Sequence, residues 1–288
     1  MTLVLAWQMM EGLAVVADTR FGSASRTVGE AGPKIFAVPI VLNKHGKSIE
    51  TEKCRLPSMG FAFAGNVFAG QTTNGLASTC LQNLLVIEDF DDGPTVSEVA
   101  DFYAHCAALV VNERRRWERT DIHLFDGLVF GRNTPASPAQ AFQVSIEIDE
   151  EAVATSKASE VAWTTHGGLI AMGSGSAKVA EIIGKAREIA SDASPTILSP
   201  LKILREVMDA PDVPSVAGCQ QFAVATPSGV ELRPGLRPVM YEMANSVPGN
   251  GPAAVLQQGL EYQILGFDMG DIGNVGGYFT GATHFASS

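Results

Sequence analysis

Three polar residues near the start of the chain have the types needed for nucleophilic catalysis. Thr2 carries a hydroxyl, and removal of Met1 would leave a free α-amine on the neighbouring carbon. Because the pKa of an N-terminal amine is about 7.7 to 8.0, a substantial neutral fraction can act as the base for that hydroxyl. Such a site also needs a cation that keeps the amine neutral and an anion that orients the cation. Lys34 and Asp18 could fill these roles, with sixteen residues from Thr2 to Asp18 and sixteen from Asp18 to Lys34.

Taken singly, each of these residues has a plainer interpretation. Thr2 is simply the residue after a start methionine, Asp18 suits the cap of a loop, and Lys34 suits a surface cation. The hypothesis of a catalytic site therefore depends on a fold that brings the three side chains together.

The segments around these residues are predicted to be short strands. Residues 3–7 alternate with a period of two, and 13–17 form an apolar run of strand length. A turn signal at 10–12 lies between them, so the second strand is predicted to return beside the first and to place Asp18 near the N-terminus. Lys34 begins the next predicted strand.

The remaining elements alternate in groups of strands and pairs of helices. Strands are predicted at 60–64, 124–130, 141–148, 169–172, 222–226 and 230–232, and helices at 67–85, 95–119, 177–190 and 200–208. Thr95 and Glu98 form a capping-box pattern at the start of the second helix. Paired helices between groups of mostly antiparallel strands predict helix layers over stacked sheets, an α+β sandwich.

The composition argues against several classes of function. With 20 Lys and Arg against 31 Asp and Glu, the formal charge is −11. Binding to nucleic acid or to an anionic membrane needs a cationic surface, so we expect neither. No apolar run approaches the roughly 20 residues of a membrane span, and no basic residue precedes the first apolar segment as in a secretory signal, so we expect a cytoplasmic protein. The four cysteines form no CxxC pair, and no zinc site is expected.

Three segments together resemble a known family. They are TLVLA at 2–6, GLAVVADTR at 12–20 and KIF at 34–36. They resemble a proteasome β-subunit and the simpler bacterial proteasome-like threonine peptidases, which are N-terminal-nucleophile hydrolases with a four-layer αββα sandwich. The resemblance implies that Thr2 is the nucleophile and that Asp18 and Lys34 tune the site. It also implies that the reaction needs no metal and no organic cofactor.

Other short motifs extend the resemblance. The segment 63–65, Phe-Ala-Gly, is similar to the family segment whose glycine amide forms the oxyanion hole, which implies this role for Gly65. The Gly-Ser-Gly turn at 173–175 implies that Ser174 bonds near the Thr2 amine; a phosphate-binding loop is the alternative interpretation. Asp212 and Ser215 are similar to the family loop that supports the amine, although an ordinary turn after a helix would explain them equally well.

The resemblance also implies a pocket for the substrate residue before the scissile bond. The positions that align with this pocket are Phe21, Gly32, Phe36, Phe63 and Val67. These residues are apolar and partly aromatic, so we expect cleavage after small or medium apolar residues.

The same resemblance implies an organisation of the chain and its partners. It assigns 1–232 to a proteasome-like peptidase domain and leaves 233–288 as a C-terminal extension of unknown role. It implies a homo-oligomeric ring that admits unfolded polypeptide or peptide substrates, with an ATP-dependent unfoldase as a candidate partner. Two alternatives stay open: an amidase of the same fold that acts on a small non-peptide amide, and a catalytically silent proteasome-like structural subunit.

Overall fold

The computed structural model divides the chain into two compact units, Met1–Arg233 and Pro234–Ser288. The structure describes residues 2–9, 12–22, 27–45, 51–86, 93–117, 124–151, 153–163, 168–189 and 199–233 of the first unit, and 235–245, 253–264, 267–268, 274–275 and 278–279 of the second. All the candidate site residues lie in the described part of the first unit.

The elements of each unit have the following bounds. The strands of the first unit are β1 (Leu3–Met9), β2 (Gly12–Asp18), β3 (Phe21–Gly22), β4 (Thr27–Gly29), β5 (Ile35–His45), β6 (Thr51–Gly65), β7 (Leu84–Val86), β8 (Phe125–Gly131), β9 (Gln140–Ile148), β10 (Ala154–Glu160), β11 (Leu169–Gly173), β12 (Gln220–Thr226) and β13 (Gly229–Arg233). Its helices are α1 (Val67–Leu81), α2 (Val96–Trp117), α3 (Ser176–Ile189) and α4 (Pro200–Met208). The second unit contains β14 (Gly235–Asn245), β15 (Ala253–Ile264), β16 (Phe267–Asp268), β17 (Asn274–Val275) and β18 (Tyr278–Phe279), with β14 and β15 forming a long antiparallel pair.

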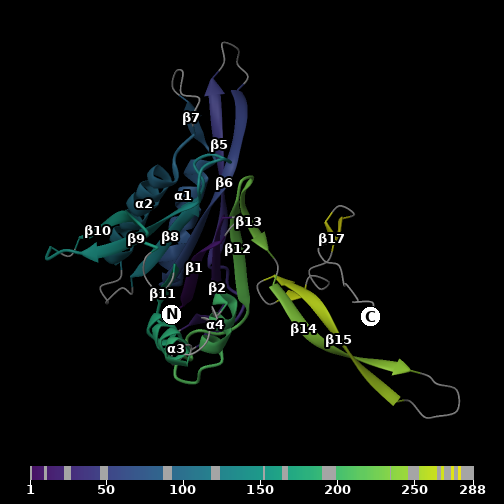
Figure 1. Cartoon of the computed structure of the whole chain (residues 1–288). Helices are drawn as coiled ribbons and strands as arrows, with labels where there is room; N and C mark the ends of the chain where they lie inside the picture. The colour runs from purple at the N-terminus through teal and green to yellow at the C-terminus, as the bar shows by residue number, and fades with distance from the viewer. Residues whose placement is uncertain are drawn as a thin grey trace. The chain divides into compact units, whose positions relative to one another are not determined.

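Eleven strands of the first unit join into one curled mixed sheet (Figure 1). Along its main path the order is β10-β9-β8-β6-β13-β12-β2-β1-β11, and β5 and β7 pair off this path. β1 and β2 form an antiparallel hairpin, with Val4 opposite Ala17. β12 pairs with β2 on the other side. Because β2 has neighbours on both edges and is buried on both faces, its residues form a continuous apolar run rather than an alternating pattern.

The four-layer αββα sandwich expected from the sequence and from the resemblance is wrong. The chain is mostly sheet, and four helices accompany the strands in the described ranges. The two groups of strands are continuous with each other, because β13 pairs in parallel with β6 at Gly229 and Ser58. Ser58 Oγ donates to Val230 O (3.2 Å) and accepts from Val230 N (3.0 Å), which holds this joint between the two halves of the sheet.

Three groups of buried apolar side chains cover the sheet. One packs α1 and α2 against β5, β6, β8 and β9, and includes Phe61 and Tyr103. The second joins residues of β1, β2 and β12 to residues of β6 and β8, such as Val15 and Leu128. The third packs α3 and α4 against β1 and β2, and includes Leu5. Figure 1 shows the two helix pairs in separate places on the sheet. β1, which begins directly after Thr2, and β2, which ends at Asp18, are therefore covered on both faces.

Two helix starts follow local sequence signals. Thr95 N and Oγ1 each donate to Glu98 Oε2 at 2.8 Å, and Glu98 N donates to Thr95 Oγ1, so the predicted capping box is confirmed. The side chain of Asn66 accepts from Ala69 N at 3.0 Å and caps α1 directly after Gly65. Within the described ranges, no helix combines the length and the apolar character needed to cross a membrane.

Replacing Ser58 by alanine tests the joint between the two halves of the sheet. The change removes both hydrogen bonds to Val230, so we expect the free energy of unfolding to fall by about 1–2 kcal/mol. Hydrogen exchange at the Val230 amide should become faster. Ser78→Ala on α1 removes a surface contact with Gln82 and should leave stability nearly unchanged. Equal stability of the two variants would contradict the role of Ser58.

Candidate active site

The end of β2 places Asp18 beside the first residues of β1. Because Val4 pairs with Ala17, the next residues along the hairpin, Leu3 and Asp18, are neighbours. Leu3 N donates to Asp18 Oδ1 at 2.8 Å, and the Asp18 side chain is fully buried. The carboxylate is thus tied to the backbone of the residue that follows Thr2.

Lys34 reaches the same carboxylate from the start of β5. Its Nζ lies 2.8 Å from Asp18 Oδ2, and both side chains are 0% exposed. The Lys34 backbone is held on both sides: its N donates to Gln221 Oε1 at 2.8 Å, and its O accepts from Phe63 N at 3.1 Å. The structure therefore brings Lys34 and Asp18 into direct contact. It also connects Asp18 to the backbone amide of Leu3, the residue that follows Thr2.

Burial shifts the pKa values of this pair toward each other. Loss of water raises the pKa of Asp18 above its ordinary value of 3.8 and lowers the pKa of Lys34 below its ordinary value of 10.5. The mutual attraction of the two charges and their hydrogen bond oppose both shifts. Lys34 therefore loses its proton at a lower pH than a lysine in water does.

A surrounding loop network orients the Asp18 carboxylate. Its Oδ2 also accepts from Arg20 N and Ala217 N, each at 3.3 Å. Arg20 in turn pairs with Glu30 at 2.8 Å and donates through Nη1 to Pro214 O at 2.7 Å. These bonds link the chain after β2 to the segment before β12, so the position of the carboxylate is fixed from two distant parts of the sequence.

Sequence reasoning missed Gln221, which organises the start of β5. Its Oε1 accepts from Lys34 N and Ile35 N, and its Nε2 donates to Ile35 O at 2.6 Å. The signal that could have revealed it is a pair of glutamines, Gln220 and Gln221, at the start of an otherwise apolar strand. An amide side chain in such a position needs polar partners, because an unsatisfied buried amide is costly.

Thr2 is fully buried, and its Oγ1 has no hydrogen-bond partner among the residues that the structure describes. A buried hydroxyl of this kind is uncommon, because the lost bonds to water cost about 1–3 kcal/mol. Gly173, at the end of β11, lies against the Thr2 backbone: a Cβ at this position would overlap Thr2 O, and the φ of Gly173 is +95°. Met1, whose removal the sequence hypothesis requires, lies outside the described residues.

Of the three residues that the resemblance assigns to the support of the Thr2 amine, the structure brings Ser174 and Ser215 together and leaves Asp212 apart. Ser174 Oγ and Ser215 Oγ lie 3.1 Å apart, and Ser215 is buried. Ser174 directly follows Gly173, which places this hydroxyl pair close to the start of β1. Asp212, by contrast, is exposed and pairs with Lys178 on α3 at 2.9 Å. The hydrogen bond from the Lys178 cation lowers the pKa of Asp212 below its ordinary value.

Gly65 ends β6 in a conformation that favours glycine. Its φ is +121°, and a Cβ there would lie 2.5 Å from Leu124 O and 2.8 Å from Phe125 Cα. The following residue, Asn66, donates its N to Leu124 O at 3.3 Å and begins the capped turn of α1. The sharp turn needs glycine for steric reasons, whether or not its amide serves as an oxyanion donor.

The five candidate pocket residues divide into two groups. Phe21 and Gly32 lie together beside the ion pair: the Phe21 ring fills the space that a side chain at Gly32 would need, and Lys34 Nζ lies 5.7 Å from the ring centroid. The other three belong to the core under α1 and α2. Phe63 is fully buried, its ring centroid lies 6.3 Å from that of Phe36, and Val67 packs against the same cluster.

Neither a protein-family model nor a curated protein sequence matches this chain. The functional conclusion therefore depends on the residues and on the geometry of the site. In the part of the chain that is described, His, Cys, Asp and Glu side chains do not gather in groups of three or more that could hold a metal ion.

Replacing Lys34 by methionine should destabilise the protein strongly, because Asp18 would stay buried without its cation. We expect the free energy of unfolding to fall by about 3–5 kcal/mol, which is typical when one partner of a buried ion pair is removed. The double variant Asp18→Asn with Lys34→Met should recover much of this loss, since no unpaired charge remains. Urea unfolding followed by circular dichroism measures each effect.

The matched control for this prediction is Lys185→Met. Lys185 pairs with Glu181 on the exposed face of α3, where ion pairs contribute little. This variant should unfold nearly like the wild type. The prediction is wrong if Lys34→Met and Lys185→Met unfold at the same urea concentration, or if the double variant is less stable than Lys34→Met alone.

Proposed function

We propose that this chain is an N-terminal threonine endopeptidase that cleaves peptide bonds through an acyl-enzyme on Thr2. The observation that carries the proposal is the fully buried Lys34–Asp18 pair, bonded to the Leu3 amide directly after Thr2. Burying two charges is costly, and hydrophobic residues of the same size usually stabilise a fold as well or better. Perturbed titratable groups of this kind cluster at functional sites, and here the neighbouring residue is a threonine with an unpartnered hydroxyl.

The proposed reaction begins after removal of Met1. The free α-amine of Thr2 takes the proton from Oγ1, and Oγ1 attacks the substrate carbonyl carbon to form a tetrahedral oxyanion. Collapse of this intermediate breaks the C–N bond; the leaving amine takes the proton from the Thr2 amine, and an ester remains on Oγ1. A water molecule then attacks the ester and releases the carboxylic acid and the Thr2 hydroxyl.

Each neighbouring residue has a proposed part in these steps. The Lys34 cation favours the neutral amine and stabilises negative charge on Oγ1, while Asp18 holds the cation in place. The Gly65 amide is the proposed donor to the oxyanion. The Ser174–Ser215 hydroxyl pair is the proposed hydrogen-bond support of the amine. Asp212 is engaged by Lys178 at the surface, so we assign it no part in the reaction.

The wider features of the proposal come from the resemblance to proteasome β-subunits. They are a ring of identical copies, unfolded polypeptide as the substrate, an ATP-dependent unfoldase as the partner and a cytoplasmic location. Cleavage after small or medium apolar residues is also proposed, with Phe21 and Gly32 as the pocket residues nearest to the ion pair. The curled sheet differs from the layered fold that the resemblance implies, so the site residues carry the proposal.

Replacing Thr2 by alanine should abolish hydrolysis and leave the fold intact. Loss of the nucleophile should lower kcat by at least about 10³-fold, whereas removal of one unpartnered hydroxyl and one methyl group should change stability by no more than about 1 kcal/mol. Turnover of a fluorogenic peptide panel measures the first effect, and thermal unfolding measures the second.

Thr79→Ala is the matched control for this substitution. Thr79 lies exposed on α1, and its Oγ1 donates to Gly75 O, so this variant should retain full activity. Intact mass must show that Met1 is absent from each protein that is compared. Wild-type turnover by Thr2→Ala would eliminate the nucleophile assignment. Hydrolysis of small amides without peptide cleavage would favour the amidase, and a wild type that lacks Met1 and hydrolyses neither would favour the silent subunit.

The pH dependence of hydrolysis tests the charge on Lys34. The rate should rise with pH as the Thr2 amine loses its proton, and it should fall again as Lys34 loses its own. Because burial lowers the pKa of Lys34, the alkaline fall should lie below pH 10.5, the ordinary pKa of a lysine. Lys34→Arg should be less active because a guanidinium differs in shape. Its residual activity should show no alkaline fall, since arginine stays charged.

The measurement is kcat/KM from pH 6 to pH 11 for the wild type and for Lys34→Arg. An alkaline fall at the same pH in both proteins would show that another group titrates, and would refute the assignment to Lys34.

A further inference from the structure

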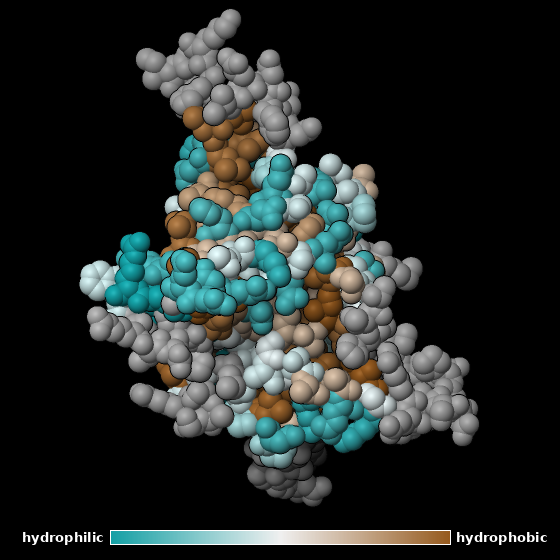
Figure 2. Space-filling view, turned by 90° about the vertical axis from the view of Figure 1, so that its left-hand side faces the viewer, coloured by the Kyte–Doolittle hydropathy of each residue, from teal (hydrophilic) through white to brown (hydrophobic). Residues whose placement is uncertain are grey.

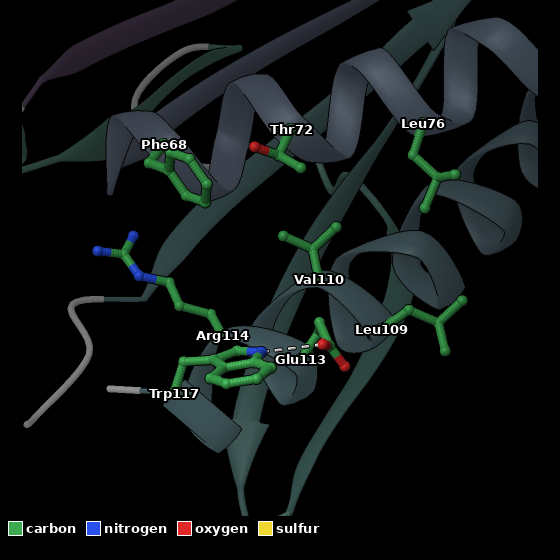
Figure 3. Close-up of a pocket in the computed structure, with 8 residues that line it drawn as sticks. All are labelled: Phe68, Thr72, Leu76, Leu109, Val110, Glu113, Arg114 and Trp117. Atoms are coloured by element: carbon green, nitrogen blue, oxygen red, sulfur yellow. Dashed lines mark hydrogen bonds between the residues drawn. The ribbon is translucent and has the colours of Figure 1, made fainter. Parts of the chain in front are cut away.

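An open apolar groove of about 560 Å³ lies between α1 and α2 (Figure 3). Large hydrophobic side chains line it and face water: Phe68 and Leu76 from α1 are 60% and 40% exposed, and Leu109 and Trp117 from α2 are 50% and 82% exposed. Figure 2 shows hydrophobic, brown surface among the teal on the side of the molecule that faces left in Figure 1. Contiguous exposed apolar surface of this kind marks interaction sites on proteins.

The composition of α1 supports an interaction at this groove. The helix runs from Val67 to Leu81 without a charged residue. A helix that faces water normally carries charged side chains on its outer face. Here the outward positions include Phe68, Thr72 and Leu76. This face is therefore suited to contact with another apolar surface.

Positive charge collects in the last turn of α2, beside the groove; of its arginines, Arg114 lines the groove, together with Glu113. Arg114, Arg115 and Arg116 form the last turn of α2, and the Arg114 guanidinium lies 4.9 Å from the centroid of the Phe68 ring. The nearby Glu113 bonds to Arg116 at 3.0 Å and to Trp117 at 3.1 Å. Arginine and tryptophan next to exposed apolar side chains are typical of binding hot spots. The groove and the basic helix end beside it together favour a partner with apolar side chains next to acidic ones.

The chain itself presents such a surface at the turn between β9 and β10. Asp149, Glu150 and Glu151 are exposed at this turn, and they are flanked by Ile148 and Val153, which are 38% and 44% exposed. Two hydrogen bonds join Asp149 and Val153 on either side of the turn: Asp149 N donates to Val153 O (3.0 Å), and Asp149 Oδ1 accepts from Val153 N (2.8 Å). Acidic and apolar groups therefore stand side by side, as they would need to in order to match the groove.

The turn does not fill the groove of its own chain. None of the residues that line the groove comes from 148–153. Asn112 holds the base of the turn, with two hydrogen bonds of 2.8 Å to the backbone of Ala154. A groove that matches a turn of the same chain, but is not lined by it, can be filled by the turn of another copy.

We propose that a second copy of this chain docks here, with its β9–β10 turn in the α1–α2 groove. Ile148 and Val153 of the turn would cover the exposed ring of Trp117, and the three acidic side chains would meet Arg115 and Arg116. The contact deepens the self-assembly proposed above and rests on it. The proposal specifies which two surfaces meet. Its test measures assembly and does not require hydrolysis.

Charge reversal on each side of the contact tests the proposal. Arg115→Glu with Arg116→Glu reverses the charge of the helix end beside the groove, and Glu150→Arg with Glu151→Arg reverses the charge of the turn. Each pair of substitutions sets like charges against each other, so each should raise the dissociation constant of the oligomer at least about 100-fold. All four substitutions in one chain should restore assembly to within about tenfold of the wild type, because every contact again joins opposite charges.

The apolar part of the contact is tested by Trp117→Ala, with Leu85→Ala as the matched control. Leu85 is 54% exposed on β7 and does not line the groove. Loss of a central aromatic anchor should weaken assembly at least about 30-fold, and the control should assemble like the wild type. Mass photometry and sedimentation of the full chain measure assembly, and circular dichroism shows that each variant is folded.

The possible outcomes show whether the proposed contact alone is wrong or whether the chain does not assemble at all. Weakened assembly of both reversed variants, with recovery in the fourfold variant, supports the contact. A wild type that stays monomeric over the micromolar range overturns both the contact and the proposed assembly, and leaves the Thr2 chemistry untouched. An oligomer that persists in every variant, or a fourfold variant weaker than both reversed variants, overturns the contact alone.

Discussion

Lys34 and Asp18 lie 2.8 Å apart without exposure to water, and the candidate site is arranged around this ion pair. Removing two charges from water is expensive, so such a pair persists only where further hydrogen bonds satisfy the charged groups. The structure supplies these bonds to Asp18 from the amides of Leu3, Arg20 and Ala217. Each donor comes from a different part of the chain. The ion pair can therefore exist only when the sheet is assembled.

The same arrangement determines what the site can do. The hairpin of β1 and β2 brings the Asp18 carboxylate to the residue after Thr2, and β12 holds the start of β5 through Gln221. Close contact between Gly173 and the Thr2 carbonyl fixes the start of β1 from the opposite side. A threonine hydroxyl is a weak nucleophile by itself, and it becomes effective when its neighbours are rigid and charged. The rigidity of this corner of the sheet is thus the structural basis for the proposed reaction.

Local patterns predicted the parts of the fold that depend on neighbouring residues. The alternation of β1, the apolar run of β2 and the capping box of α2 each have a local cause. The placement of Asp18 near the N-terminus followed from two short strands and their turn, whereas a place for Lys34 in the same site was implied by the resemblance. Contacts between residues far apart in the sequence could not be predicted from such local patterns. The joint between Gly229 and Ser58 links residues far apart in the sequence, and it makes one curled sheet where stacked layers were expected. Likewise, Phe63 faces the core under α1 and α2, and Asp212 meets a lysine of α3, because tertiary contacts decide which way these side chains turn.

The most direct test of the account is the intact mass of the purified protein before and after treatment with an epoxyketone or a β-lactone that reacts with N-terminal threonine. The account predicts a starting mass that lacks Met1, followed by one stoichiometric adduct that peptide mapping assigns to Thr2. A protein that retains Met1 and forms no adduct would contradict it, and so would an adduct that maps to another residue.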